Sequence, residues 1–463
     1  MEAETLLQEI SAFCRLADMA ETTFGRRAVN DGKFVGRLKY GGKVTTATVE
    51  RVRAFIAENR PAEGEDRLPG YDRRAGRLQG AGHPTLPPEQ NFRFYDNRQK
   101  YLMFVNTCSE KRVVADRVAA ELDYIRPTPP ALRIFDAGVG DGTVLSRVMR
   151  TMHRRFPTYP FYVVGKEVSL EDVRLALEKA PDRFYEHPST VLVMTNLPYA
   201  EAPWLTPRRP DQAARMVWKE VALKGATAAE FEDQIVALGD FLNEKWRARV
   251  SKRTGNPMAE TPAVLVLYRE DCKFLLDQAL PRRGAPKADY DVVIASQPYR
   301  ARASVQFKAR RVVAPLARAL GPGGRLLGVH SCGGDPGLEI IQKVWPGEEP
   351  FRTDRQAVLR ATKHELGRDA PDFTFTAASD AKALFRYDMH TLPGEIELAD
   401  AIGVSTLLAA WNAATYVAQI EDTRLSGVMG DAGYLEATRD VLKSRGGLWF
   451  YDETFVISRK RDP

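Results

Sequence analysis

The pattern of apolar and polar positions divides the chain into three parts. Residues 4–58 have the spacing of short amphipathic helices, as in "ETLLQEISAFCRLA". Residues 59–93 are dominated by glycine, proline and charge, which predicts a flexible linker. From residue 94 to 463, short β-branched and aromatic runs alternate with helical spacing. This alternation predicts an α/β domain with a mainly parallel sheet.

The helices expected in residues 4–58 are short and separated by tight turns. "TTFGRRAV" precedes the turn "NDGK", and "FVGRLKYGG" follows it. A fourth helix, "TTATVERVRAFIAEN", has Thr45 or Thr46 as a candidate N-cap. This order resembles the repressor-like helix-turn-helix family, although the turn differs from the usual one. The resemblance implies a small all-α domain at residues 1–58.

Basic residues gather around this predicted turn, where Asp31 is the single acid. They are Arg26, Arg27, Lys33, Arg37, Lys39 and Lys43. If the third helix enters a major groove, these side chains would contact DNA phosphates. The alternative is a solvated basic face on a docking or dimerisation domain.

Glycines alternate in "LRIFDAGVGDGTVL" (132–145), directly after an apolar run. Gly138, Gly140 and Gly142 follow one another at every second position, and Thr143 stands where a dinucleotide-binding loop has its third glycine. Asp136 and Asp141 place carboxylates where a pyrophosphate needs N–H donors. The loop therefore favours a cationic ligand without phosphate, such as S-adenosylmethionine. A turn that holds no ligand is the alternative.

A second apolar run, "FYVVGKEVS" (161–169), ends in Glu167. A carboxylate at the end of the second strand can accept hydrogen bonds from both ribose hydroxyls. Ser169 and Asp172 have the spacing of a helix N-cap, which is compatible with Glu167 facing the ligand.

Together these motifs resemble class I S-adenosylmethionine-dependent methyltransferases over residues 94–463. The resemblance rests on "FDAGVGDGT", "VVGKE", "YDVVIASQPY" (290–299), "ALGPGGRLLGVHS" (319–331) and "GGLWFYDETFVISRK" (446–460). It implies a Rossmann-like sheet of seven strands, with the last segment antiparallel and the cofactor at the carboxyl ends. The implied cofactor-binding residues are Asp136, Ala137, Gly138, Gly140, Asp141, Gly142, Thr143, Glu167, Asn196 and Leu197.

Two stretches interrupt the expected fold, at about 204–260 and 350–430, and both are predicted to be helical. Such insertions usually form an acceptor pocket or a lid. The helical lead-in, residues 94–122, brings Tyr101 and Lys111 within reach of the site, although helix packing is the expected role of Tyr101.

The candidate acceptor residues come from two similar motifs. "NLPY" ends in Tyr199, and "SQPY" begins at Ser296 and ends in Tyr299. Both resemble the motif with which amino-methyltransferases hold an exocyclic amine and stack on its base. NLPY directly follows the expected third strand, so Asn196 and Leu197 are better interpreted as adenine contacts. SQPY has the expected position but lacks a proline, and a turn lining the cofactor pocket is the alternative.

Two further assignments stay open in the sequence. His330 follows the fifth strand and is a candidate base, or else a hydrogen-bonded structural histidine. The third strand could instead be "AVLVLYREDCKFLL" (263–276), with Asp271 at the adenine.

Composition excludes several other classes. Of the 463 residues, 44% are hydrophobic and 28% charged, and no apolar run is long enough to cross a membrane. The four cysteines are scattered and the six histidines lack metal-ligand spacing, so we expect free thiols and no metal. The acidic start lacks a signal-peptide pattern, which favours the cytoplasm. A net charge of +6 is compatible with a nucleic-acid partner.

The sequence therefore predicts an S-adenosylmethionine-dependent methyltransferase that acts on a nitrogen or oxygen of a small molecule. A homodimer is compatible with this sequence. The alternatives are an amino-methyltransferase of DNA or RNA and a DNA-binding regulator whose methyltransferase domain senses a ligand.

Overall fold

The computed structural model forms two compact units, Met1–Leu86 and Pro87–Pro463. It describes residues 6–7, 9–11, 13–14, 21–31, 34–39, 44–59, 98–251, 257–285, 287–390, 402–430 and 432–461. The boundary between the units falls within the predicted linker, and residues 60–97 lie outside the described residues.

The first unit is helical, with α2 (Glu21–Val29), α3 (Phe34–Lys39) and α4 (Thr46–Asn59) in its described part. Phe24, Val35 and Val52 belong to its core. A Cβ atom on Gly25 would lie 2.3 Å from the carbonyl oxygen of Asp31, so the α2–α3 turn needs glycine there.

Only part of the predicted basic cluster lies in the described residues. Arg26 and Arg27 are exposed on α2, and Arg37 forms an ion pair with Asp31. Lys33, Lys43 and the side chain of Lys39 are not among the described groups. The helix-turn-helix assignment and DNA contact therefore stay predictions.

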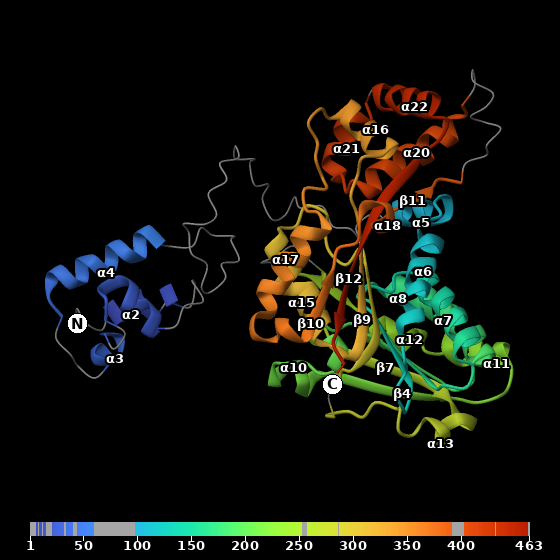
Figure 1. The fold of residues 1–463 in the computed structure, drawn as a ribbon, viewed down its shortest axis with the longest axis horizontal. Helices are drawn as coiled ribbons and strands as arrows, with labels where there is room; N and C mark the ends of the chain where they lie inside the picture. The colour runs from blue at the N-terminus through green and yellow to red at the C-terminus, as the bar shows by residue number, and fades with distance from the viewer. Residues whose placement is uncertain are drawn as a thin grey trace. The chain divides into compact units, whose positions relative to one another are not determined.

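A ten-stranded sheet organises the second unit (Figure 1). Its main path runs β10-β12-β9-β8-β1-β2-β3-β7-β4, and β11 also pairs with β12. The strands are β1 (Leu132–Asp136), β2 (Phe161–Lys166), β3 (Thr190–Thr195), β4 (Val217–Leu223), β7 (Ala263–Arg269), β8 (Tyr290–Ser296), β9 (Leu320–Ser331), β10 (Phe373–Thr376), β11 (Leu384–Asp388) and β12 (Trp449–Arg459). A separate hairpin contains β5 (Ala248–Val250) and β6 (Pro257–Ala259).

Seven of these strands give the arrangement that the methyltransferase resemblance implied. Strands β3, β2, β1, β8 and β9 are parallel neighbours. Strand β12 lies antiparallel between β9 and β10. The central strands are buried throughout because helices cover both faces, as parallel sheets require.

Helices on the two faces give two hydrophobic clusters. Figure 1 shows α6 and α7 on one side of the sheet and α15 and α17 on the other. The first face carries α5 (Arg98–Thr107), α6 (Glu110–Glu121), α7 (Thr143–Arg155), α8 (Leu170–Glu178), α9 (Ala180–Glu186) and α11 (Ala228–Val236). The second carries α14 (Val305–Phe307), η5 (Lys308–Val313), α15 (Ala314–Arg318) and α17 (Arg355–Leu366).

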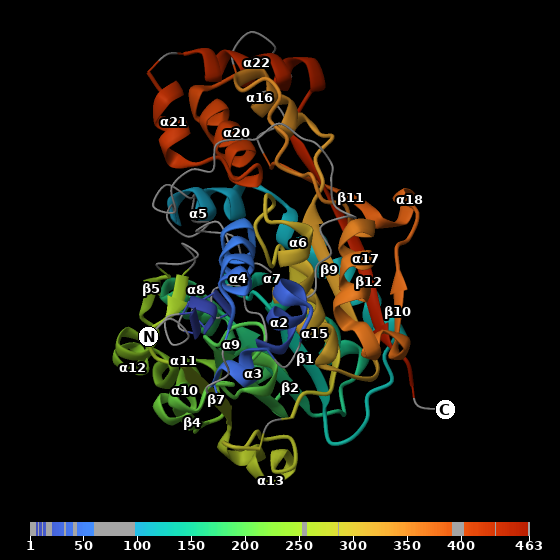
Figure 2. The ribbon, with the colours of Figure 1, turned by 90° about the vertical axis from the view of Figure 1, so that its left-hand side faces the viewer.

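A group of helices packs together near the start of β12 (Figure 2). It contains α16 (Pro336–Val344), α20 (Val404–Val417), α21 (Asp422–Val428) and α22 (Gly433–Arg445). Helix α20 also contacts α5, which brings the carboxyl-terminal helices to the lead-in of the sheet.

Short elements connect these parts. They are η2 (Leu122–Tyr124), η3 (Ala202–Trp204), α10 (Pro210–Arg215), α12 (Gly239–Lys245), η4 (Glu270–Cys272), α13 (Lys273–Leu276), η6 (Gly367–Asp372) and α18 (Asp380–Ala383). The four cysteines are free thiols. None of the described helices combines the length and apolar character that crossing a membrane requires.

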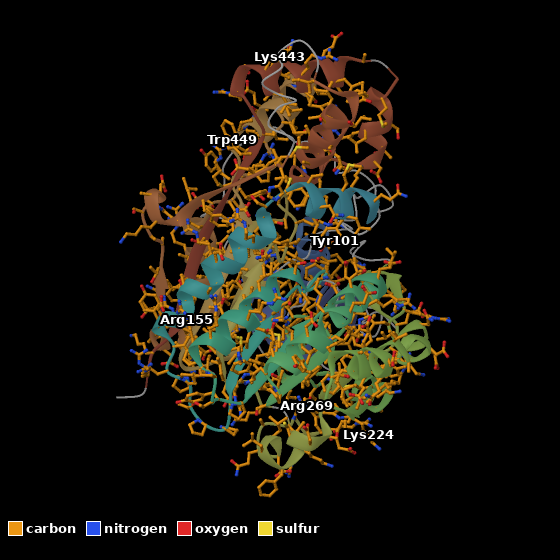
Figure 3. The ribbon with its side chains drawn as sticks, turned by 90° about the vertical axis from the view of Figure 1, so that its right-hand side faces the viewer. Tyr101, Arg155, Lys224, Arg269, Lys443 and Trp449 are labelled. Atoms are coloured by element: carbon orange, nitrogen blue, oxygen red, sulfur yellow. The ribbon has the colours of Figure 1, made fainter. Side chains whose placement is uncertain are left out.

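The prediction that both insertions are wholly helical is wrong. "VWKEVAL" forms β4, which extends the sheet beyond β3 by pairing in parallel with β7. The ends of these strands lie near Arg269 and Lys224 in Figure 3. Strands β10 and β11 lie in the second insertion and pair with β12. Each of these strands forms its backbone hydrogen bonds with a neighbouring strand of the sheet. Local periodicity does not reveal such a partner.

Candidate cofactor and acceptor site

The glycine loop turns directly from β1 into α7. Gly140 and Gly142 have φ of +54° and +80°, in the left-handed region that favours glycine. A Cβ atom on Gly142 would lie 2.7 Å from the Cα of Ala176, so the loop packs closely on α8. Nothing lies within 4 Å of a Cβ atom built on Gly138. Gly142 therefore serves the packing of the loop, whereas Gly138 leaves space beside it.

Glu167 lies directly after β2 and is almost completely buried. One carboxylate oxygen accepts from the Gly140 amide at 2.9 Å, and the other accepts from the amides of Val168 and Ser169 at 2.7 and 2.9 Å. The indole N–H of Trp246 donates to the Glu167 carbonyl oxygen at 2.8 Å. The carboxylate is thus held in one place, and Ser169 caps α8 by accepting from the Asp172 amide as expected.

The two acids in the glycine loop, Asp136 and Asp141, form hydrogen bonds that stabilise it. Asp136 accepts from the Gly138 amide at 3.0 Å, and Asp141 accepts from the Tyr101 hydroxyl at 3.3 Å. Tyr101 also accepts from the Asp141 amide at 3.1 Å, so it both packs and orders the loop. Thr143 donates to Asp141 and begins α7, and the buried Ala137 donates its amide to the carbonyl of β8 residue Ile294.

Burial raises the pKa of Asp136 to about 6, despite the opposing effects of the Gly138 amide and Lys111. The folded protein therefore holds this proton more tightly than the unfolded chain. We expect the free energy of unfolding to fall by about 2 kcal/mol relative to Asp136→Asn as the pH rises from 4 to 6. Urea unfolding of the unaltered protein and of Asp136→Asn across this pH range measures the change. A constant difference in the free energy of unfolding between the two proteins would contradict the expectation.

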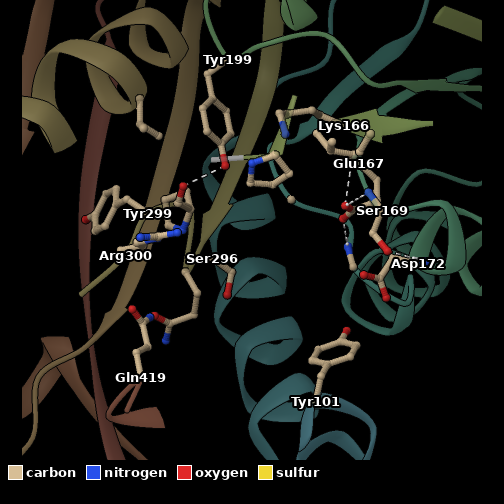
Figure 4. Close-up of a pocket in the computed structure, with 18 of the residues that line it drawn as sticks. Tyr101, Lys166, Glu167, Ser169, Asp172, Tyr199, Ser296, Tyr299, Arg300 and Gln419 are labelled. Atoms are coloured by element: carbon tan, nitrogen blue, oxygen red, sulfur yellow. Dashed lines mark hydrogen bonds between the residues drawn. The ribbon is translucent and has the colours of Figure 1, made fainter. Parts of the chain in front are cut away.

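A cavity of about 900 Å³ opens over the carboxyl ends of these strands. Figure 4 shows Glu167 and Tyr101 on one side of it and Tyr299, Arg300 and Gln419 on the other. Of the predicted site residues, Gly138, Gly140, Glu167, Tyr199, Ser296 and Tyr299 line the cavity. Asp136, Ala137, Asp141, Gly142 and Thr143 lie behind the lining and support it.

The third strand ends where the main prediction placed it, but the residues that follow it do not line the cavity. Strand β3 pairs in parallel with β2, whereas β7 is antiparallel to β3, so Asn196 and not Asp271 follows the third strand. Asn196 does not line the cavity. Its side chain accepts from the Ala263 amide at 2.8 Å and donates to the Thr261 carbonyl at 3.0 Å. Leu197 packs in the core. Neither residue lines the cavity, because hydrogen bonds to Ala263 and Thr261 hold the Asn196 side chain and Leu197 is buried in the core.

The NLPY and SQPY motifs are joined by a hydrogen bond. The Tyr199 hydroxyl donates to the Pro298 carbonyl at 2.8 Å, as the dashed line in Figure 4 shows. Ser296 faces the cavity, but the Tyr299 ring points away from Glu167. The Tyr299 hydroxyl forms a hydrogen bond with Nδ1 of His330. This placement supports the interpretation of SQPY as a turn that lines the pocket.

His330 does not line the cavity, so the structure does not support it as a base. Its two ring nitrogens lie 2.7 Å from the Tyr299 hydroxyl and 2.7 Å from a carboxylate oxygen of Glu453. Glu453 also accepts from Arg355 at 2.6 Å. Burial lowers the pKa of His330. The histidine belongs to a buried polar network that supports the SQPY turn.

Sequence reasoning missed several lining residues, above all Lys166. Its ammonium lies 4.6 Å from the centre of the Tyr199 ring, and burial lowers its pKa. A lysine at the end of an otherwise apolar strand was the available indication. Trp246 comes from the insertion, where nothing in the local pattern points to Glu167.

No protein-family model matches the chain, and neither does any curated protein. Among solved structures it is similar to a geranyl diphosphate methyltransferase in complex with GPP and sinefungin (13% identity, 74% of this chain, 78% of that chain, TM-score 0.27). A putative sarcosine dimethylglycine methyltransferase from Galdieria sulphuraria is 8% identical (76% and 85% covered, TM-score 0.31). PKMT2 from Rickettsia typhi in complex with AdoHcy is 9% identical (76% and 53% covered, TM-score 0.25).

Proposed function

We propose that the chain is an S-adenosylmethionine-dependent methyltransferase whose acceptor is a nitrogen or oxygen of a small molecule. The observation that carries the proposal is the buried Glu167 carboxylate, held against the Gly140 amide at the edge of the cavity. A carboxylate in this position suits ribose hydroxyls and opposes a pyrophosphate. The open space beside Gly138 gives a ligand access to the loop backbone.

Residues of the chain can hold each part of this cofactor. Glu167 would accept from the ribose, and Lys111, which lines the cavity, is a cation for the carboxylate of the methionine part. Bound S-adenosylmethionine supplies an electrophilic methyl group on a sulfonium that is already a good leaving group. The chain contributes alignment, and it excludes water where the cavity walls enclose the bound molecules.

The size of the cavity supports a small acceptor, since about 900 Å³ lies in the range of small-molecule sites. A nucleobase acceptor would need an aromatic side chain on which to stack. The hydroxyl of Tyr199 is tied to the Pro298 carbonyl and that of Tyr299 is bonded to His330, so both rings are held by the fold.

Calorimetric titration of the full-length protein tests the cofactor. We expect S-adenosylhomocysteine to bind with one-site stoichiometry and NAD to give no heat of binding, because the pyrophosphate would face the Glu167 carboxylate. Binding of NAD in place of S-adenosylhomocysteine would contradict the proposal.

A further inference from the structure

A second group of residues lines the cavity beside the glycine loop and is not used by the cofactor contacts above. We call it the aromatic–acidic recess, and it consists of Tyr101, Phe104, Glu110, Tyr387, Tyr416 and Asp452. All except Asp452 line the cavity. The residues come from α5, α6, β11, α20 and β12, which only the tertiary fold brings together.

Aromatic rings form the walls of the recess. Phe104 stacks on Tyr416 with ring centres 4.6 Å apart, and Tyr101 lies 6.1 Å from Tyr416. The Tyr387 ring packs edge-on to Phe104 at 6.2 Å. Tyr101 already has a cation at its ring, since the Lys111 ammonium lies 5.6 Å from the ring centre, and aromatic rings attract cations through their negative faces.

Two buried acids adjoin these rings. Glu110 is the first residue of α6 and is 5% exposed, and Lys111 Nζ lies 3.8 Å from its carboxylate. Among the described residues, none donates a hydrogen bond to this carboxylate. Asp452 is fully buried and accepts from Gln297 at 3.2 Å through one oxygen.

Alternation along β12 explains why Asp452 faces this recess and Glu453 faces away. Successive side chains of a strand point to opposite faces. Asp452 therefore shares a face with Tyr387, whose strand partner is Phe450, whereas Glu453 lies on the His330 side. Burial first, and then the charge of Glu110, raises the pKa of Asp452.

Two buried polar atoms of the recess lack a hydrogen-bond partner among the described residues. They are the hydroxyl of Tyr387, which is 1% exposed, and the second carboxylate oxygen of Asp452. Buried polar groups are normally paired, so unpaired ones beside a cavity indicate a missing partner. The groups left over are acceptors, with the tyrosine also a donor, which suits a ligand that carries N–H groups.

We infer that the recess binds the amino group of the methyl acceptor, and that the acceptor is a primary or secondary alkylamine. The inference rests on the proposed function. Glu110 holds the amine directly, the rings of Phe104, Tyr387 and Tyr416 surround it, and Asp452 acts behind them as a positioning residue.

The chemistry of transfer balances with these residues. The bound ammonium first gives one proton to the Glu110 carboxylate, which leaves a neutral nitrogen with a lone pair. The lone pair forms the new N–C bond while the S–C bond of the sulfonium breaks, and the sulfur leaves as a neutral thioether. The product leaves as the methylated ammonium, and Glu110 returns its proton to water. No further oxidant, reductant or co-reactant is needed.

Binding of n-butylamine and of n-butanol, its uncharged counterpart, to the complex with S-adenosylhomocysteine tests the inference. Ligand-observed NMR measures both affinities on the full-length protein. We expect butylamine to bind at least tenfold more tightly than butanol, and Glu110→Gln to remove that preference. Tyr387→Phe should weaken butylamine severalfold. Glu178→Gln, which removes an exposed carboxylate on α8 away from the cavity, should change neither affinity.

The cofactor affinity of the same variants separates the possible failures. Glu110→Gln should bind S-adenosylhomocysteine as the unaltered protein does, which also shows that the variant folds. A large loss of that affinity would mean that the recess holds the ammonium of the cofactor, which overturns the inference but not the proposed function. Equal binding of butylamine and butanol would also overturn it. An unaltered protein that binds no S-adenosylhomocysteine would overturn both.

Discussion

Glu167→Ala is expected to weaken the binding of S-adenosylhomocysteine by about 10- to 150-fold. This range corresponds to about 1.5–3 kcal/mol, the usual contribution of hydrogen bonds to a charged group. The variant loses the ribose partner and leaves the amides of Gly140, Val168 and Ser169 without their acceptor. Calorimetric titration of both proteins measures the change.

Two companion variants make the result specific. Glu167→Gln keeps the shape and one acceptor oxygen, so it should retain the fold and lose part of the affinity. Glu178→Ala removes an exposed carboxylate from α8 and should change the affinity less than twofold. Unchanged affinity in Glu167→Ala, with the fold intact, would show that this carboxylate does not hold the ligand.

Gly142→Ala is expected to lower the free energy of unfolding by about 2–5 kcal/mol. Its φ of +80° costs an alanine about 1–2 kcal/mol, and the new methyl group would meet the α8 backbone at 2.7 Å, which adds about 1–3 kcal/mol of overpacking. Urea denaturation measures the loss.

Gly138→Ala is the matched control, because it adds the same methyl group to the same loop. Nothing lies within 4 Å of the new atom, so stability should stay within about 1 kcal/mol. The methyl group would instead enter the space left for the cofactor and lower its affinity. If both variants were equally destabilised, the division of roles between the two glycines would be wrong.

Local pattern was sufficient for the parts of the site that lie on consecutive residues. The order of β1, glycine loop, β2 and Glu167 follows from apolar runs that end in glycine or acid, and the structure has these elements where the sequence predicted them. The capping of α8 by Ser169 and the antiparallel β12 are confirmed for the same reason. Each is a property of a few neighbouring residues.

Contacts between distant segments could not be predicted in this way. Asn196 has the right position for an adenine contact, but β7 pairs beside β3 and its first amide takes the Asn196 oxygen. His330 stands at the expected strand end, but Glu453 and Tyr299 occupy both ring nitrogens. In each case the partner comes from another strand or turn of the chain.

The sequence alone determined the parallel sheet, the glycine loop and the acid that follows the second strand, because backbone conformation and strand burial depend on local residue types. Only the tertiary structure decided which side chains face the cavity. Glu110 lies more than 270 residues before Tyr387 and Asp452 in the chain, and the three meet because β11 pairs with β12 beside the start of α6. Strand pairing and helix packing set that meeting, and neither leaves a trace in the local pattern.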